Sequence, residues 1–194
     1  MARTHGSKAE TTRPLIREAA RSLFARDGYA AVSMRQIAAR VGVRVGTIYG
    51  YTADKQALLV DLLRTHMEEL LADWHDDPAL PPLERLERFV RFHIDCSLER
   101  TESVFLAYME LRSLTPENRR EIATLRRQYE DALEAILKDG VAQGDMKMAD
   151  TRLATMALIA MLTGVTNWYR PGGRLDRDHV TRIYWALVRG AVGA

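Results

Sequence analysis

The sequence has few of the residues that cross-link small secreted proteins, because its 194 residues include a single cysteine, Cys96. One cysteine forms neither an internal disulfide nor an all-cysteine metal site, so we expect a protein from a reducing compartment. We interpret Cys96 as a small buried apolar residue rather than a redox sensor. A chain of this length buries enough apolar surface to fold without cross-links.

Long hydrophobic runs are also missing. The longest apolar stretch, residues 153–165, is shorter than the roughly 20 residues that a membrane-spanning helix needs. Residues 1–14 contain no apolar segment of the kind found in secretory signals. We therefore expect a cytoplasmic protein with no membrane partner.

No segment alternates apolar and polar residues over the length of a strand, whereas apolar residues recur at helical spacing along the whole chain. This pattern predicts an all-α fold of about nine helices. Proline, glycine and capping residues mark the ends of the later helices. We expect those helices at 83–100, 103–114, 116–140, 151–169 and 177–192.

Charge is unevenly distributed. Residues 1–60 contain ten Lys or Arg and four Asp or Glu, whereas residues 61–194 contain 18 and 22. A basic segment favours a polyanionic partner. On charge alone, a solvated basic surface is an equally good explanation.

The basic segment begins with a predicted helix. We expect it to start at Thr12, with Pro14 in its first turn, and to end at Gly28. Helical spacing places Leu15 on its buried face. The other residues expected on that face are Ala19, Leu23 and Phe24.

Two short helices follow. Ser33 and Gln36 have the spacing of a capping box, which predicts a helix that starts at Met34 and ends at Gly42. On the next short helix, Ile48 is expected to face inward. Asp54 is then the predicted N-cap of a long amphipathic helix.

Two helices joined by a tight glycine turn, with small Ala38 where they cross, are typical of a helix-turn-helix, whose second helix enters the DNA major groove. Opposite Ile48, the second helix presents Val45, Gly46, Tyr49 and Gly50. Glycine costs about 1 kcal/mol relative to alanine within a helix. We therefore interpret the two glycines as allowing a partner to approach closely.

Residues 11–59, TTRPLIREAARSLFARDGYAAVSMRQIAARVGVRVGTIYGYTADKQALL, resemble the DNA-binding domain of the TetR family of bacterial transcriptional repressors. The positions that carry the family pattern are Phe24, Gly28, Ser33, Gly42, Val43, Gly46, Thr47, Ile48, Tyr49 and Lys55. The resemblance implies a helix-turn-helix DNA-binding domain at 1–55 and a helical ligand-binding and dimerisation domain at 56–194. It also implies a homodimer that binds a palindromic operator.

The resemblance gives Arg35 a base or phosphate contact and gives Thr47, Tyr49, Tyr51 and Lys55 mainly phosphate contacts. The chemistry agrees, because hydroxyls and ammonium groups bind phosphate oxygens, whereas arginine reads guanine bidentately. Arg44 and Val45 depart from the family pattern and offer a charged base reader and an apolar contact to a thymine methyl. The expected DNA-binding residues are Ser33, Arg35, Arg44, Val45, Gly46, Thr47, Tyr49, Gly50, Tyr51 and Lys55.

The sequence after the helix-turn-helix indicates which class of effector the protein binds. Residues 99–146 and the segment NWYRPGGRL at 167–175 are similar to TetR regulators of fatty-acid or steroid catabolism, which respond to acyl-coenzyme A thioesters. An apolar pocket with a few polar anchors suits such a ligand. The candidate ligand-binding residues are Phe89, Phe92, Phe105, Tyr108, Met109, Arg112, Met156, Trp168 and Arg170. Helical spacing alone also explains each apolar one as ordinary core.

A repressor of drug efflux with a promiscuous pocket is the alternative within the family, and the eight methionines suit it.

Family members dimerise through their last two long helices. The apolar residues available there are Leu158, Met161, Leu162, Val165, Ile183, Tyr184, Leu187 and Val188.

Enzyme motifs are lacking. The five histidines are scattered, and the sequence has no nucleophile elbow, phosphate loop or dinucleotide fingerprint. We expect no catalytic activity, cofactor or metal. A helical bundle that contacts protein instead of DNA, or an enzyme of that shape, is the alternative of another class.

Overall fold

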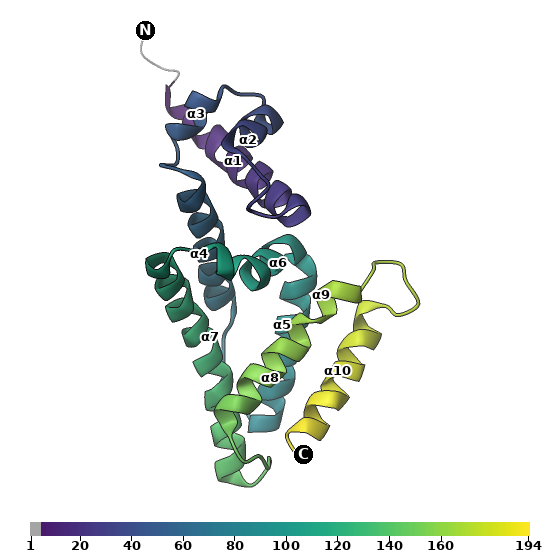
Figure 1. The fold of residues 1–194 in the computed structure, drawn as a ribbon. Helices are drawn as coiled ribbons and strands as arrows, with labels where there is room; N and C mark the ends of the chain where they lie inside the picture. The colour runs from purple at the N-terminus through teal and green to yellow at the C-terminus, as the bar shows by residue number, and fades with distance from the viewer. Residues whose placement is uncertain (1–4) are drawn as a thin grey trace. The chain divides into compact units, whose positions relative to one another are not determined.

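The computed structural model describes the backbone of residues 5–194 and the side chains of residues 11–194. Every regular element in this part of the chain is helical, which confirms the all-α prediction (Figure 1). The ten α-helices agree with the expected number of about nine, because α9 (Val165–Trp168) follows α8 (Thr151–Thr163) after a single residue. None of the described helices has the length and apolar character needed to cross a bilayer.

The chain forms two compact units. The first contains the residues up to Met67 together with Glu102–Ala123, and the second contains Glu68–Thr101 and Thr124–Ala194. Both units are therefore discontinuous in the sequence, because α4 and α7 each contribute to both.

The first unit is built on the N-terminal helices. Its elements are α1 (His5–Asp27), α2 (Met34–Val41), α3 (Val45–Tyr49), the first part of α4 (Lys55–Asp73), α6 (Thr101–Met109), the 3-10 helix η1 (Glu110–Ser113) and the start of α7 (Pro116–Gln143). In Figure 1, α1, α2 and α3 lie together in the purple and blue part of the chain.

The prediction for α1 was wrong in two details. The helix begins at His5 rather than at Thr12, so Pro14 lies inside it, where proline removes one backbone hydrogen bond. Leu15 is 56% exposed, and Ile16 is buried in its place. Ala19, Leu23 and Phe24 are buried as predicted, and Ile16 and Ala20 complete the buried stripe.

The core of the first unit joins all of its long segments. Phe24, Ile37 and Leu59 are fully buried in one hydrophobic cluster. Leu106 and Ile122, from α6 and α7, belong to the same cluster. The later segment is therefore part of the N-terminal fold rather than an attachment to it.

The second unit is a helical bundle around α5 (Pro82–Glu99), which contacts α8, α9 and α10 (Arg177–Ala191). An almost completely buried arginine, Arg85, holds the loop after α4. It donates two hydrogen bonds to the carboxylate of Asp76, at 2.9 and 2.6 Å, and one to Asp139, at 2.6 Å. Arg85 thus ties this loop and α7 to α5.

Candidate DNA interface and effector region

The start of α2 is fixed by a capping box, as predicted. The Ser33 N–H donates to Gln36 Oε1 at 2.7 Å, and the Gln36 N–H donates to Ser33 Oγ at 3.3 Å. These bonds satisfy amides that have no partner within the helix. They also place exposed Arg35 in the first turn of α2.

The turn between α2 and α3 depends on Gly42, which has φ +79°. Its N–H donates to Ala38 O at 2.9 Å, and the Val43 N–H donates to the same oxygen at 3.0 Å. A Cβ at Gly42 would meet nothing within 4 Å, so the left-handed backbone, and not crowding, requires glycine here. The turn confirms the predicted helix-turn-helix connection.

Helix α3 has one buried face and one open face. Ile48 is fully buried, as expected. A Cβ at Gly46 would meet nothing within 4 Å, so packing inside the chain does not require glycine there. The Arg44 side chain makes no capping hydrogen bond. The exposed residues of this region are Arg44, Gly46, Thr47, Tyr49 and Gly50, and Val45 and Tyr51 are half-buried.

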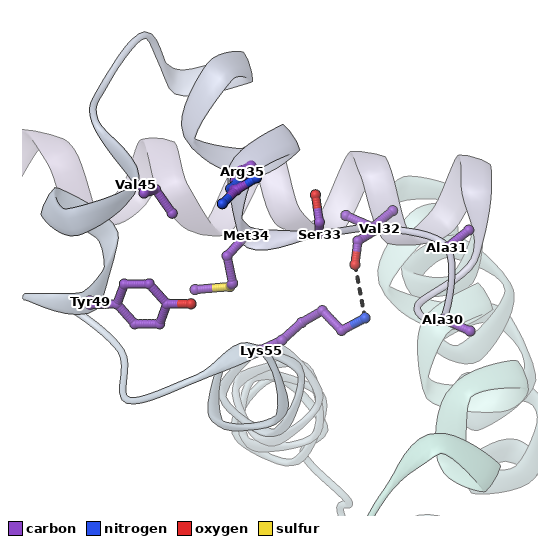
Figure 2. A pocket seen from close by; sticks show the side chains of 9 residues that line it. All are labelled: Ala30, Ala31, Val32, Ser33, Met34, Arg35, Val45, Tyr49 and Lys55. Atoms are coloured by element: carbon purple, nitrogen blue, oxygen red, sulfur yellow. Dashed lines mark hydrogen bonds between the residues drawn. The ribbon is translucent and has the colours of Figure 1, made fainter.

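A groove of about 710 Å³ runs beside this face (Figure 2). The loop before α2 and the first two residues of α2 form one side of the groove, and α3 and the start of α4 contribute the rest. It is lined by Ala30, Ala31, Val32, Ser33, Met34, Arg35, Val45, Tyr49 and Lys55. Five of the residues expected to bind DNA thus line one groove: Ser33, Arg35, Val45, Tyr49 and Lys55.

Lys55 is more constrained than the sequence indicated. Its ammonium donates to Tyr29 O at 2.9 Å and to Val32 O at 2.8 Å, and it lies 4.3 Å from the centroid of the Tyr29 ring. An ammonium has three N–H donors, so these two bonds leave one for a ligand in the groove. Lys55 therefore joins α4 to the loop before α2, and its phosphate contact stays a prediction.

The candidate ligand residues divide between the two units. Phe89 is fully buried in the second unit, and the half-buried ring of Phe92 is near it. Both pack against Trp74, with ring centroids 5.0 and 5.3 Å from the indole. The other candidates of the second unit, Met156, Trp168 and Arg170, are exposed, and so are those of the first unit: Phe105, Tyr108, Met109 and Arg112.

Three polar side chains lie around Phe89, namely Trp74, His93 and Tyr129. The indole nitrogen of Trp74 is buried and has no hydrogen-bond partner among the described residues. His93 Nδ1 is 2.9 Å from Tyr129 Oη, and its Nε2 is 3.0 Å from Thr163 Oγ1. Burial raises the pKa of the Tyr129 phenol well above its usual value, so this hydroxyl stays protonated. A lone tryptophan or tyrosine on an apolar helix face carries no sequence signal for such a cluster.

Residues 16–62 match the family described as bacterial regulatory proteins of the tetR family, and residues 79–192 match the tetracyclin repressor-like C-terminal domain. The chain belongs to the TetR family. It is therefore a transcriptional regulator and not an enzyme, as predicted.

Two TetR-family relatives cover most of the chain. The repressor KstR2 of Mycobacterium tuberculosis is 28% identical over 185 residues, which are 90% of each protein. The fatty acid metabolism regulator protein of Bacillus subtilis is 27% identical over 165 residues, which are 83% of this chain and 85% of that protein.

Solved structures of TetR-family proteins have the same fold. A regulatory protein from Rhodococcus RHA1 gives a TM-score of 0.88 at 27% identity, over 93% of this chain and 96% of its own. AibR, solved in complex with isovaleryl coenzyme A and operator DNA, gives a TM-score of 0.81 at 23% identity, over 91% of this chain and 97% of its own. The second likeness is one of fold alone.

In this TetR-family chain the predicted dimer residues differ in exposure. Ile183 and Leu187 are 44% and 53% exposed, and Met161 and Tyr184 are half-buried. The remaining four are buried inside the unit: Leu158, Leu162, Val165 and Val188. Helical spacing found the apolar residues but did not distinguish the face that packs inside the unit from the face that is open. Leu153 and Met156, at 61% and 46% exposed, add to the open apolar surface of α8.

Proposed function

We propose that this TetR-family chain is a homodimeric repressor that binds a palindromic operator and is released from it by a small-molecule effector. The observation that carries the proposal is the open face of α3, which lies beside the groove and near its polar side chains. The opposite face of α3 is anchored in the core by Ile48. The same proposal assigns the DNA contacts to residues 1–55 and effector binding and dimerisation to residues 56–194.

In this proposal, the polar groups of the site have two tasks. The hydroxyls of Thr47 and Tyr49 and the remaining N–H of Lys55 bind phosphate oxygens, which sets the position of the protein on the duplex. Arg35 and Arg44, whose guanidinium groups are exposed, read base edges. A partner approaches α3 closely because Gly46 has no side chain.

The proposed effector is an acyl-coenzyme A thioester or a similar lipid-like metabolite. One relative, 27% identical to this chain, is named a regulator of fatty acid metabolism, which supports this class. In the second unit, the half-buried rings of Trp74 and Phe92 offer apolar surface, and fully buried Phe89 packs against Trp74. The unpartnered indole N–H of Trp74 is a donor for a ligand carbonyl, because a buried donor without an acceptor is costly.

Release from DNA follows from differential binding. An effector that binds more tightly to a state in which the recognition helices do not fit the operator lowers DNA affinity by the ratio of its two affinities. DNA lowers the affinity for the effector by the same factor.

The test is a release experiment on an operator selected from random duplexes with the full-length protein. Fluorescence anisotropy of the labelled operator is followed as acyl-coenzyme A thioesters of different chain lengths, the matching free acids or cationic drugs are added. Release by thioesters at concentrations where the free acids have no effect is expected. Release by cationic drugs alone would contradict the thioester proposal and establish the efflux alternative.

A further inference from the structure

Residues 102–122 lie beyond the helix-turn-helix in the sequence but belong to the same compact unit. They do more than contribute core residues, because their polar groups bond to the loop that borders the groove. Glu110 and Gln56 make most of these bonds, and we refer to them with their partners as the Glu110–Gln56 network.

Glu110 is only 5% exposed. Its Oε1 accepts the Tyr29 N–H at 3.1 Å, and its Oε2 accepts the Ser113 hydroxyl at 2.6 Å. Tyr29 directly follows Gly28, whose φ of +83° ends α1. The carboxylate of Glu110 thus holds the first amide after this turn, 81 positions away in the sequence.

Gln56, in the first turn of α4, joins the same elements from the other side. Its Nε2 donates to Tyr29 Oη and to the carbonyl oxygen of Ser113, both at 3.1 Å. Its Oε1 accepts the Thr115 N–H at 2.7 Å and the Asn118 side-chain amide at 3.4 Å. The Thr115 amide only donates and the Ser113 carbonyl only accepts, so the orientation of the Gln56 amide is determined.

The network reaches the groove through Tyr29. The N–H of Tyr29 is held by Glu110 and its hydroxyl by Gln56, and its carbonyl oxygen and ring contact the Lys55 ammonium. The second acceptor for Lys55, Val32 O, lies three residues further along the same loop. The position of this loop therefore sets the position of the Lys55 charge.

We propose that Glu110 and Gln56 are positioning residues for DNA binding, and that residues 110–118 complete a DNA-binding unit that the helix-turn-helix and α4 alone do not form. This inference rests on the proposed function. Glu110 is buried and Gln56 half-buried, and neither lines the groove, so they act on DNA affinity through Tyr29 and Lys55.

The test uses the full-length chain and two duplexes, the selected operator and one of unrelated sequence. Glu110→Ala and Gln56→Ala are expected to weaken binding to both duplexes by about tenfold. This is the effect of losing roughly one charge-assisted hydrogen bond, the proposed contact of the Lys55 ammonium with a phosphate. In a double-mutant cycle, Lys55→Ala is expected to cost much less in the Glu110→Ala background than in the parent, because the contact it removes is already displaced.

Glu102→Ala is the matched control. Glu102 also joins α6 to α1, through Arg21 Nε at 3.4 Å and the Ser22 hydroxyl at 3.1 Å, but it has no bond to the loop before α2. Its removal is expected to leave DNA affinity unchanged. Glu110→Gln keeps an acceptor for the Tyr29 N–H and is expected to retain part of the affinity, which also provides a test if Glu110→Ala does not fold.

Circular dichroism on the same samples establishes which variants are folded. Folded Glu110→Ala or Gln56→Ala protein with parental affinity would overturn the inference, and so would losses that simply add to the loss from Lys55→Ala. A parent chain that binds neither duplex would instead overturn the proposed function, so the two failures are distinguishable.

Discussion

At the scale of single residues, Gly46 is the position where folding and the proposed DNA contact favour different side chains. A Cβ there meets nothing within 4 Å in the chain, and the backbone is helical. Gly46→Ala is expected to raise the free energy of unfolding by about 0.5–1 kcal/mol, because alanine loses less backbone entropy. The same methyl group is expected to weaken binding to duplex DNA. Urea unfolding and anisotropy titrations measure the two effects, and unchanged DNA affinity would contradict the assigned close approach.

Tyr49 tests the phosphate contacts at the same scale. Tyr49→Phe removes one hydroxyl from a ring that is 53% exposed and is expected to weaken operator and unrelated DNA alike. Tyr108→Phe is the control, because Tyr108 is 51% exposed in the same unit but does not line the groove. A change in base preference, with affinity for unrelated DNA unaffected, would show that Tyr49 does not contact phosphate.

Short residue patterns predicted the hydrogen bonds and the turn that shape the helix-turn-helix. The Ser33 capping box and the left-handed turn at Gly42 were predictable because each depends on residues within a few positions of one another. The two carbonyl partners of Lys55 are 26 and 23 positions away, and Glu110 is 81 from Tyr29. Such pairs are set by packing of distant segments, so one sequence without the fold gives no signal for them.

At the scale of elements, sequence patterns located the helices better than the faces that they bury. Glycine, proline and capping residues placed the later helices within a few residues of their observed bounds. On α1, α8 and α10, however, apolar residues occupy more than one face. Spacing alone did not show that Leu15 is exposed or that Val188 is buried, because the face that is buried depends on where neighbouring helices pack.

The N-terminus of α2 provides a prediction for an element. Ser33→Ala removes the acceptor for the Gln36 N–H and is expected to lower the free energy of unfolding by about 1 kcal/mol. Ser33→Asp keeps an N-cap acceptor and the favourable interaction with the helix dipole, so it is expected to retain stability.

Both variants are also compared on DNA. Ser33→Asp places a carboxylate in the groove, where it repels phosphates, so its DNA affinity is expected to fall below that of Ser33→Ala. Urea unfolding and anisotropy on the two proteins give the comparison. Equal or tighter DNA binding by Ser33→Asp would mean that the groove does not face the DNA backbone.

At the scale of the whole molecule, the proposed dimer makes operator recognition possible. Helix α3 spans only Val45–Tyr49 and reads few base pairs, so one subunit alone is expected to bind weakly. Leu187→Glu is expected to give a folded monomer that loses tight operator binding, because Leu187 is 53% exposed in the single chain and its replacement is buried only in a dimer.

Val188→Glu is the contrasting variant. Val188 is fully buried, so a charge there is expected to unfold the second unit itself rather than to separate subunits. Light scattering, circular dichroism and operator titration on the same samples distinguish the two cases. A folded Leu187→Glu monomer with parental affinity would refute dimerisation through this surface as a requirement for operator binding.

The sequence predicted the family of the whole molecule more specifically than the class of its effector. The motif from Phe24 to Lys55 is specific, because DNA binding by a helix-turn-helix requires a fixed local geometry. An effector pocket requires only apolar surface and a few anchors, which many helix faces provide. The buried indole nitrogen of Trp74, whose ring packs against Phe89, was for this reason not predicted.

The central claim is that the first unit binds duplex DNA through its basic groove and the open face of α3. The most direct measurement is an anisotropy titration of the selected operator by the full-length protein at increasing salt. We expect a linear fall of log affinity with log salt, amounting to about a thousandfold between roughly 50 and 200 mM if six phosphates are neutralised by the two subunits. Absence of duplex binding, or binding that does not change with salt, would contradict the account.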